Sequence, residues 1–230
     1  ILMKISILIP TFNNLPYLKF FLNSLKKNSL FEHEIVIHVN DGSEGTLDFV
    51  QKNNFKFTHS KENTGLCSSM NNAYKLSTSD FLLYAHDDMY FCKNWDKYLI
   101  DEINKQKNNF YYLSGTNVST RFGLINYNCG DTLENFDENK FLKFCIDDNT
   151  PDLQSAHWAP HLIHRELWDK IGGFSEEFNP GDGSDPDFCM KLWLENVRIF
   201  KGISKFKVYH FNSLTTRNNK VKLNNGTRIF

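Results

Sequence analysis

The chain has 230 residues, of which 40% are hydrophobic and 15% are aromatic. This composition predicts a packed globular protein and excludes an intrinsically disordered chain. No apolar stretch approaches the roughly 18 residues that a transmembrane helix needs, and we expect residues 1–10 to form a strand, not a signal peptide. We therefore expect a soluble, cytoplasmic protein. Five cysteines without a Cys-x-x-Cys spacing indicate neither a disulfide framework nor a zinc knuckle.

The formal net charge is −1, but basic residues gather at the end of the sequence. Residues 196–230 contain eight Lys or Arg and no Asp or Glu, so the rest of the chain is acidic. Two interpretations remain open: a solvated tail that keeps the protein in solution, or a segment that contacts an anionic partner such as a membrane surface. We expect no nucleic-acid partner.

The first 117 residues alternate predicted strands and helices. Short apolar runs predict strands at 5–9, 34–39, 55–59 and 81–85. Periodic apolar residues predict a helix after each strand, around 18–25, 46–51, 66–76 and 95–103. Strands that alternate with helices favour crossover connections and hence an α/β fold with a mostly parallel central sheet flanked by helices.

The second half is less regular. Residues 118–153 are polar and show no legible pattern. An apolar segment at 159–163, a helix from Arg165, a helix from Ser184 and a strand through Val208 follow. No internal repeat or linker divides the chain, so we expect one domain.

Polar loops follow the first four predicted strands, at residues 10–14, 40–43, 62–65 and 86–88. In a parallel sheet these loops converge on one edge, where nucleotides bind. Each loop alone reads as an ordinary turn, but together they predict a nucleotide site. The sequence lacks Gly-x-Gly-x-x-Gly and Gly-x4-Gly-Lys-[Ser/Thr], which excludes the ordinary dinucleotide and P-loop sites.

Asp87 and Asp88 directly follow the apolar run at 81–85. Two adjacent carboxylates without a basic neighbour in sequence repel each other unless a cation bridges them. Oxygen ligands of this kind suit Mg²⁺ or Mn²⁺ holding a phosphate. The alternative is an acidic, solvated turn.

These motifs, in this order, resemble family 2 glycosyltransferases of the GT-A fold. The resemblance rests on residues 7–13, 40–43, 63–65, 86–88, 167–174 and 184–187, and it covers roughly residues 4–212. It implies a single Rossmann-like domain over 1–230, with a nucleotide-sugar-binding half at 3–117, an acceptor and catalytic half at 118–212, and a basic tail at 213–230.

The resemblance also implies roles for single residues. Asp185 would be the catalytic base, and Asp88 and His210 would bind a divalent cation, Mn²⁺ or Mg²⁺. The nucleotide sugar, most simply a UDP-sugar, would contact Pro10, Thr11, Phe12, Asn13, Asp41, Asn63, Gly65 and Asp87. The reaction implied is inverting transfer to a hydroxyl of a glycan, a lipid-linked acceptor or a protein.

Four positions depart from the family pattern. Ala85 stands where many members carry the first acid of Asp-x-Asp, Asn40 replaces an Asp, and Ser184 replaces the Glu before the catalytic Asp. Met70 stands where an Arg is common, which leaves the phosphate side short of a cation. These departures keep open a second interpretation, a catalytically silent protein that binds nucleotide or glycan as a partner subunit.

The basic tail offers a replacement for that cation. We expect Arg217 to fold over the bound diphosphate as a lid. The competing interpretation is peripheral membrane contact through residues such as Lys220 and Lys222. A sugar-phosphate nucleotidylyltransferase is disfavoured, because residues 10–14 lack the Gly-rich basic loop that such an enzyme needs.

Several polar residues also have a purely structural interpretation. Ser184 reads as the N-cap of its helix, with Asp187 in the first turn. His210 could be a structural histidine after a strand. A zinc site at His157 and His161 is disfavoured, since Pro160 prevents a regular helix that would bring them to one face.

Overall fold

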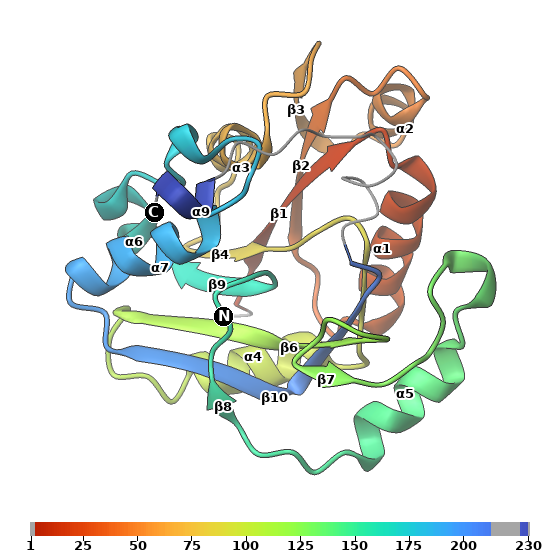
Figure 1. Cartoon of the computed structure of the whole chain (residues 1–230), viewed down its shortest axis with the longest axis vertical. Coiled ribbons are helices and arrows are strands. Elements are labelled where there is room, and N and C mark those ends of the chain that lie inside the picture. The colour runs from red at the N-terminus through yellow and green to blue at the C-terminus, as the bar shows by residue number, and fades with distance from the viewer. Residues whose placement is uncertain (1–2, 213–225, 230) are drawn as a thin grey trace.

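The structure is a computed structural model that describes residues 3–212 and 226–229. Its centre is a mixed sheet with strand order β3-β2-β1-β4-β9-β6-β10-β5, to which β7 and β8 add short pairings (Figure 1). The strands are β1 (Ile5–Phe12), β2 (Glu34–Asn40), β3 (Lys56–Ser60), β4 (Phe81–Tyr84), β5 (Met89–Phe91), β6 (Tyr111–Ser119), β7 (Ile125–Asn126), β8 (Leu153–Gln154), β9 (His161–His164) and β10 (Ile199–His210). The predicted α/β fold with a central, helix-flanked sheet is confirmed.

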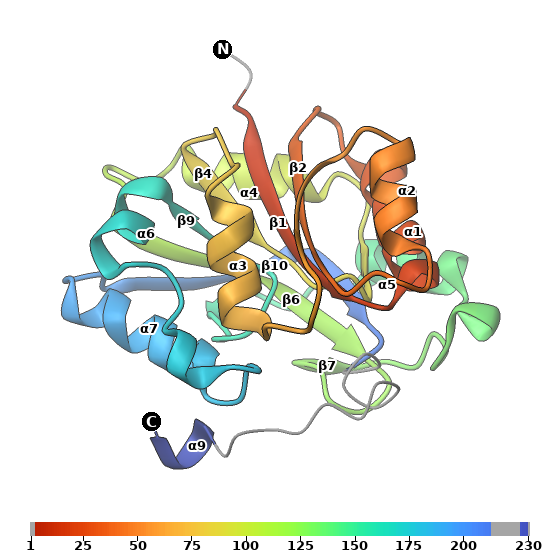
Figure 2. The ribbon, with the colours of Figure 1, turned by 90° about the horizontal axis from the view of Figure 1, so that it is seen from above.

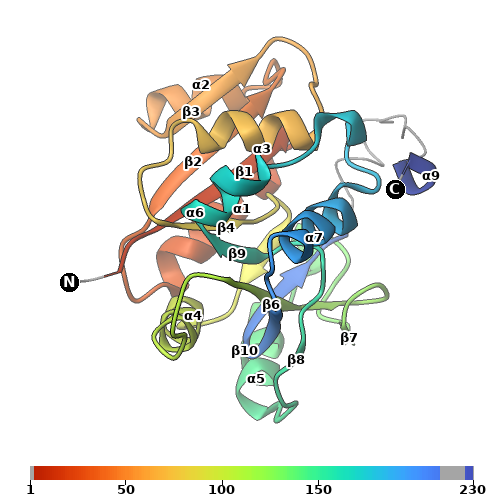
Figure 3. The same ribbon diagram turned by 90° about the vertical axis from the view of Figure 1, so that its left-hand side faces the viewer.

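Helices cover both faces of the sheet (Figures 2 and 3). The helices are α1 (Leu15–Asn28), α2 (Thr46–Lys52), α3 (Leu66–Tyr74), α4 (Trp95–Ile103), α5 (Glu138–Asp147), α6 (Arg165–Ile171), α7 (Ser184–Leu194) and α9 (Gly226–Ile229), with 3-10 turns at Leu133–Asn135 and Glu176–Phe178. Figure 3 shows α3, α6 and α7 on one side of the sheet and α4 on the other. No helix in residues 3–212 or 226–229 is long and apolar enough to cross a membrane.

The sheet is less parallel than the sequence predicts. The block β3-β2-β1-β4 is parallel, as expected from its crossover helices. Strand β9, however, runs antiparallel to both β4 and β6, and β5 runs antiparallel to β10. Between β6 and β9 the chain runs through β7, a 3-10 turn, α5 and β8, so this connection is not the simple strand–helix–strand crossover that joins parallel neighbours.

The predicted apolar faces form the core. In α1 the residues Leu18, Phe21, Leu22 and Leu25 are buried, as predicted. Trp95 of α4 packs its ring against Phe91 and Phe206 beneath the other end of the sheet. Such aromatic contacts contribute beyond the area that they bury.

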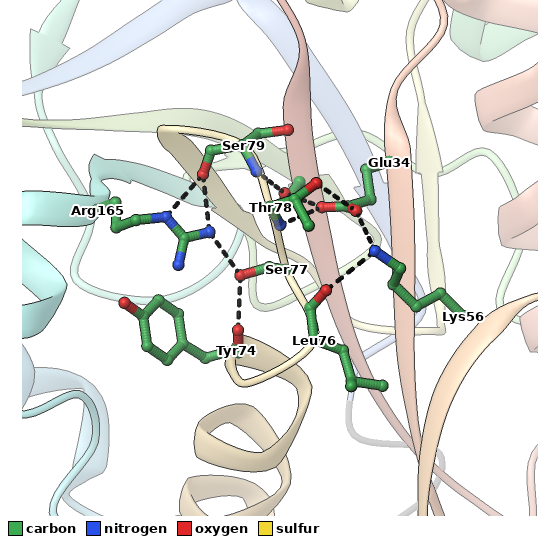
Figure 4. A network of polar contacts seen from close by, with 9 residues as sticks. Glu34, Lys56, Tyr74, Leu76, Ser77, Thr78, Ser79 and Arg165 are labelled. Atoms are coloured by element: carbon green, nitrogen blue, oxygen red, sulfur yellow. Dashed lines mark hydrogen bonds and ion pairs between the residues drawn. The ribbon is translucent and has the colours of Figure 1, made fainter.

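A polar network ties the edge of the sheet opposite the loops to the turn before β4 (Figure 4). Glu34 accepts hydrogen bonds from Lys56 Nζ (2.6 Å), Thr78 N (2.7 Å) and Thr78 Oγ1 (2.8 Å), and also from Ser6 Oγ. Although burial opposes ionisation, these bonds lower the pKa of Glu34 to about 2. The carboxylate therefore joins three strands to one turn.

Arg165 extends this network from α6. Its Nε and Nη2 donate to Ser79 O at 3.0 and 2.8 Å, and Nη2 also donates to Ser77 Oγ at 2.9 Å (Figure 4). The guanidinium thereby fixes the loop that leads into β4. Asp87 and Asp88 lie beyond the other end of this strand.

Candidate active site

Asp87 lies in the turn between β4 and β5 and is 4% exposed. Thr11 Oγ1, from the end of β1, donates to Asp87 Oδ2 at 2.7 Å, and Asn14 Nδ2 donates to Asp87 Oδ1 at 3.1 Å. Burial and the neighbouring Asp88 charge raise the pKa of Asp87 to about 7. The first and fourth predicted loops thus meet at this carboxylate.

Asp88 faces the end of β10. The antiparallel pairing of β10 with β5 sets His210 opposite Met89, and the Phe211 N–H donates to Asp88 O at 3.1 Å. His210 Nε2 lies 3.1 Å from Asp88 Oδ1. Burial acts to raise the pKa of Asp88, but the His210 imidazole outweighs it and lowers the pKa below the usual value. The structure therefore brings together the two predicted metal ligands, 122 positions apart in the sequence.

His86 joins this pair, although the sequence analysis assigned it no role. Its Nδ1 lies 3.4 Å from His210 Nε2 and 4.0 Å from Asp88 Oδ1. Burial, followed by the His210 charge, lowers the pKa of His86 to about 4, so the ring is neutral at neutral pH. One signal in the sequence was the spacing of two positions between His86 and Asp88, because alternate residues around a tight turn can face the same side.

The donor atoms of His86, Asp88 and His210 all lie within 4.8 Å of one another. One carboxylate oxygen and two imidazole nitrogens form a donor set that suits divalent ions such as Mn²⁺, Co²⁺ or Zn²⁺. The residues therefore fit the divalent cation that the sequence predicts. We refer to these three residues as the His-Asp-His cluster.

The second loop is anchored to the first. Asn13 Nδ2 donates to Asp41 Oδ2 at 2.9 Å, and the Gly42 N–H donates to Asn13 Oδ1 at 2.9 Å. The Asn13 hydrogen bond lowers the pKa of Asp41, with help from Ser43. Both Asn13 and Asp41 have left-handed backbones, with φ of 47° and 58°, which Asn and Asp tolerate better than most residues. Asp41 is thus an ionised acceptor held at the rim.

Asn40, a departure from the family pattern, has a structural role. Its Oδ1 accepts from Thr64 N (2.9 Å) and Thr64 Oγ1 (3.0 Å), and its Nδ2 donates to Ser69 Oγ (2.8 Å). An Asp at this position could not donate to Ser69. Asn40 therefore ties the end of β2 to the loop that contains Asn63 and Gly65.

Asn179 connects this loop to the second half of the chain. Helix α3 has no capping side chain of its own, and Asn179 Oδ1 accepts from Cys67 N (3.0 Å) and Ser68 N (3.3 Å) instead. A Cβ on Gly65, whose φ is +86°, would lie 2.4 Å from the same Oδ1. Only glycine fits here, which gives the predicted Gly65 a clear structural reason.

Asp185 lies in the first turn of α7, which begins shortly after Asn179 in the sequence. Its Oδ1 is buried and has no hydrogen-bond partner among the residues that the structure describes. Burial raises the pKa of Asp185 to about 7. Asp187, two residues further along α7, accepts a hydrogen bond from Ser175 Oγ at 2.7 Å. Of these two acids, Asp185 has the oxygen that is available to accept a proton.

The prediction that Ser184 caps α7 is wrong. The N-cap is Gly183, with a left-handed φ of 82°, and Ser184 is the first helical residue. Its buried hydroxyl donates to Gly181 O at 2.7 Å. Met70 is fully buried in the core, so that position contributes no cation. Arg217, Lys220 and Lys222 lie outside the described residues.

A cavity of ≈250 Å³ opens beside His210. Phe211 and Asn212 also line it, and its other lining residues, which include Arg121 and Asp131, come from the segments after β6 and before the 3-10 turn at Leu133–Asn135. No sequence pattern predicts this lining, because it depends on segments that meet only in the fold.

Comparison with solved structures shows the same fold in other proteins. The chain matches the S. aureus TarS 1-349 structure over 90% of its length and 60% of that chain, with a TM-score of 0.66 and 22% identity. Related TarS structures are complexes with UDP and UDP-GlcNAc. GalNAc-T7, solved with UDP, GalNAc and Mn²⁺, matches over 90% of this chain and 44% of its own, with a TM-score of 0.68 and 16% identity.

Sequence comparison identifies the family. A processive diacylglycerol beta-glycosyltransferase of Mycoplasma genitalium is 29% identical over 112 residues, which is 44% of this chain and 32% of that protein. The chain thus spans about a third of this relative and less than two thirds of the solved neighbours. The family model for glycosyl transferase family 2 matches residues 6–172, most of the chain. The chain therefore belongs to glycosyl transferase family 2.

Proposed function

We propose that this protein transfers a sugar from a nucleotide diphosphate sugar, a UDP-sugar in the simplest case, to an acceptor hydroxyl with inversion at the anomeric carbon. The observation that carries the proposal is the approach of His210 to Asp88 beside Asp87, on the sheet edge that also holds the Asn13–Asp41 pair. Family membership and the UDP complexes of the neighbours support the same donor class.

In this proposal the donor lies along the loops of the first half. The base and ribose contact Pro10, Phe12, Asp41 and Asn63. Asp87, which Thr11 orients, accepts a hydrogen bond from a ribose hydroxyl. Asp88 and His210 would hold the divalent cation, Mn²⁺ or Mg²⁺. When bound, such a cation neutralises charge on the leaving diphosphate.

Asp185 removes the acceptor proton. As the acceptor oxygen attacks C1, the new C–O bond forms, the bond from C1 to the diphosphate oxygen breaks, and the hydroxyl proton moves to Asp185 Oδ1. Attack from the face opposite the leaving group inverts the anomeric centre. A pKa near 7 suits this role, because the group is partly deprotonated at neutral pH yet basic enough to take a proton.

The acceptor class is a glycan, a lipid-linked molecule or a protein. The cavity that Arg121, Asp131 and His210 line is the proposed entry for the acceptor, because it opens beside the cluster. The name of the curated relative specifies diacylglycerol, which is compatible with a lipid-linked acceptor and with peripheral contact at a cytoplasmic membrane surface.

A nucleotide-sugar screen tests the proposal. We expect one UDP-sugar, with Mn²⁺, to raise the thermal midpoint, since a ligand that binds only the folded state stabilises it. The same donor should then release UDP by slow hydrolysis, and faster when the acceptor is present. Stabilisation without any release would instead indicate the silent, nucleotide-binding subunit that Ala85 and Ser184 keep open.

A further inference from the structure

His86 directly follows Ala85 and lies close to the two metal ligands of the proposed function. Ala85, where many family members carry an acid, is fully buried and offers no donor. The next residue, His86, turns its ring toward the cluster, with a ring-centroid distance of 5.3 Å to His210. Its side chain is 27% exposed.

Tyr84 fixes the orientation of the His86 ring. Tyr84 Oη lies 2.6 Å from His86 Nε2, and the two rings meet edge to face at 5.2 Å. With Nε2 engaged by the hydroxyl, Nδ1 is the nitrogen that faces Asp88 and His210. A hydrogen bond to the far nitrogen is how metal-binding histidines are commonly oriented.

The separations within the cluster fit a single ion. The three pairs of donor atoms are 3.1, 3.4 and 4.0 Å apart. Bonds of about 2.1 Å place two ligand atoms about 3 Å apart at a right angle and about 4.2 Å apart across the ion. All three separations lie between these limits.

We propose that His86 Nδ1 is a third protein ligand of the divalent cation, and that the resulting nitrogen-rich site favours Mn²⁺ and Co²⁺ over Mg²⁺. This inference rests on the proposed function, which needs only Asp88 and His210. Its added content is the donor set: two imidazoles and one carboxylate. Imidazole suits the transition metals, whereas Mg²⁺ prefers oxygen ligands and retains its waters.

Cation titration with and without His86 tests the donor set. Calorimetry with UDP present would measure Mn²⁺, Co²⁺ and Mg²⁺ affinity for the wild type, His86→Phe, His86→Ala and a control. The phenylalanine keeps the ring volume without a donor nitrogen, and the alanine variant guards against a packing artefact. The matched control is His157→Gln, since His157 is an exposed histidine away from the cluster.

We expect both His86 variants to lose about tenfold or more in Mn²⁺ and Co²⁺ affinity and much less in Mg²⁺ affinity, while His157→Gln changes nothing. Pulsed electron paramagnetic resonance of bound Mn²⁺ should detect two coordinated nitrogens in the wild type and one in the His86 variants. This spectroscopic count does not depend on turnover.

The inference and the proposed function fail in different ways. If the His86 variants keep the wild-type Mn²⁺ affinity and nitrogen count while Asp88→Asn abolishes binding, His86 is not a ligand but the metal site stands. If the wild type binds no divalent cation even with UDP, the metal dependence in the proposed function falls, and this inference falls with it.

Discussion

Asp185 and Asp87 both have a pKa of about 7, but their surroundings differ. Thr11 and Asn14 each donate to Asp87, so this carboxylate is already positioned as an acceptor. Asp185 owes its pKa to burial, and its Oδ1 has no partner among residues 3–212 and 226–229. The contrast is the reason for assigning proton removal to Asp185.

Asp185→Asn is expected to lower turnover by about 10²- to 10⁴-fold with little change in donor affinity, because it removes a general base and keeps the shape. Asp187→Asn is the matched control, since its carboxylate lies in the same helical turn but is held by Ser175. Steady-state kinetics and UDP calorimetry measure both effects. Wild-type turnover in Asp185→Asn would transfer the role to Asp182 or Asp187.

The pH dependence of turnover follows from the same carboxylate. A general base works when deprotonated, so a pKa of about 7 predicts turnover that rises with pH through about 7 and then levels off. Rates measured on a soluble acceptor between pH 5.5 and 8.5 would show it. A profile that is flat across this interval would contradict the assignment of Asp185.

Asp88→Asn should abolish cation-dependent UDP binding and leave the fold intact, because the amide keeps the shape but loses the charge. Asp48→Asn, on α2, is a suitable control, because Asp48 is an acid away from the His-Asp-His cluster. Calorimetry with Mn²⁺ compares the two. An unchanged Mn²⁺-dependent affinity in Asp88→Asn would remove Asp88 from the metal site.

At the scale of elements, Glu34 holds β2 to the turn before β4. Its pKa of about 2, against an ordinary 4.5, means that the folded state favours the ionised form. That contribution is fully present above about pH 4.5 and is lost as the pH falls through about 2. A shift of this size corresponds to roughly 3–4 kcal/mol, and solvent screening at the half-exposed Lys56 partner reduces the expected contribution to about 2 kcal/mol.

Glu34→Gln should therefore lower the free energy of unfolding by about 2 kcal/mol at pH 7, and the difference from wild type should shrink as the pH drops toward 3. Urea unfolding at pH 7, 5 and 3 measures this. Glu32→Gln, an exposed acid two residues away, is the control. A difference that stays constant with pH would show that the charge of Glu34 does not stabilise the fold.

Helix α3 depends on a cap from a distant segment. Asn179→Ala should cost about 1–2 kcal/mol, because it leaves the N–H groups of Cys67 and Ser68 without their acceptor. It should also reduce turnover, since the same segment leads into α7 and Asp185. Asn179→Asp keeps the acceptor oxygen and should retain most stability. Equal losses in both variants would argue against the cap.

Local sequence patterns predicted most helices and strands, but they did not predict which distant strands pair with each other. The strands and helices of the first half have clear periodicity, and their bounds agree with the structure to within a few residues. Helix α5 was not predicted, although Phe141, Phe144 and Cys145 have the spacing of one helical face, because the polar residues around this short stretch obscured the pattern. The antiparallel entry of β9 depends on which neighbours it meets, and sequence spacing does not encode this.

In the candidate site, too, local motifs predicted some residues, while others depend on contacts between distant segments. Asp87, Asp88 and Asp185 were predicted from motifs, and the structure places each at the expected element end. His86 was missed, because its relevance comes from the approach of β10, which brings His210 to within 3.4 Å of it. The acceptor side also depends on such approaches, so its cavity could not be read from residues 118–153.

At the scale of the whole molecule, the strand order interleaves the two predicted halves. Strand β9, from the second half, lies between β4 and β6 of the first half (Figure 1). A fragment ending near residue 117 would therefore leave both β4 and β6 with open, apolar edges. Open edges of this kind template association between chains.

Dissection of the gene at the boundary between the two predicted halves is therefore expected to give aggregating fragments, not two modules. Separately expressed 1–117 and 118–230 should be insoluble or unfolded by circular dichroism, whereas co-expression should restore a soluble complex. Modular exchange of acceptor specificity between relatives would have to transplant loops around the sheet, such as the segment after β6, because the interleaved strands do not allow a half to be exchanged as a unit.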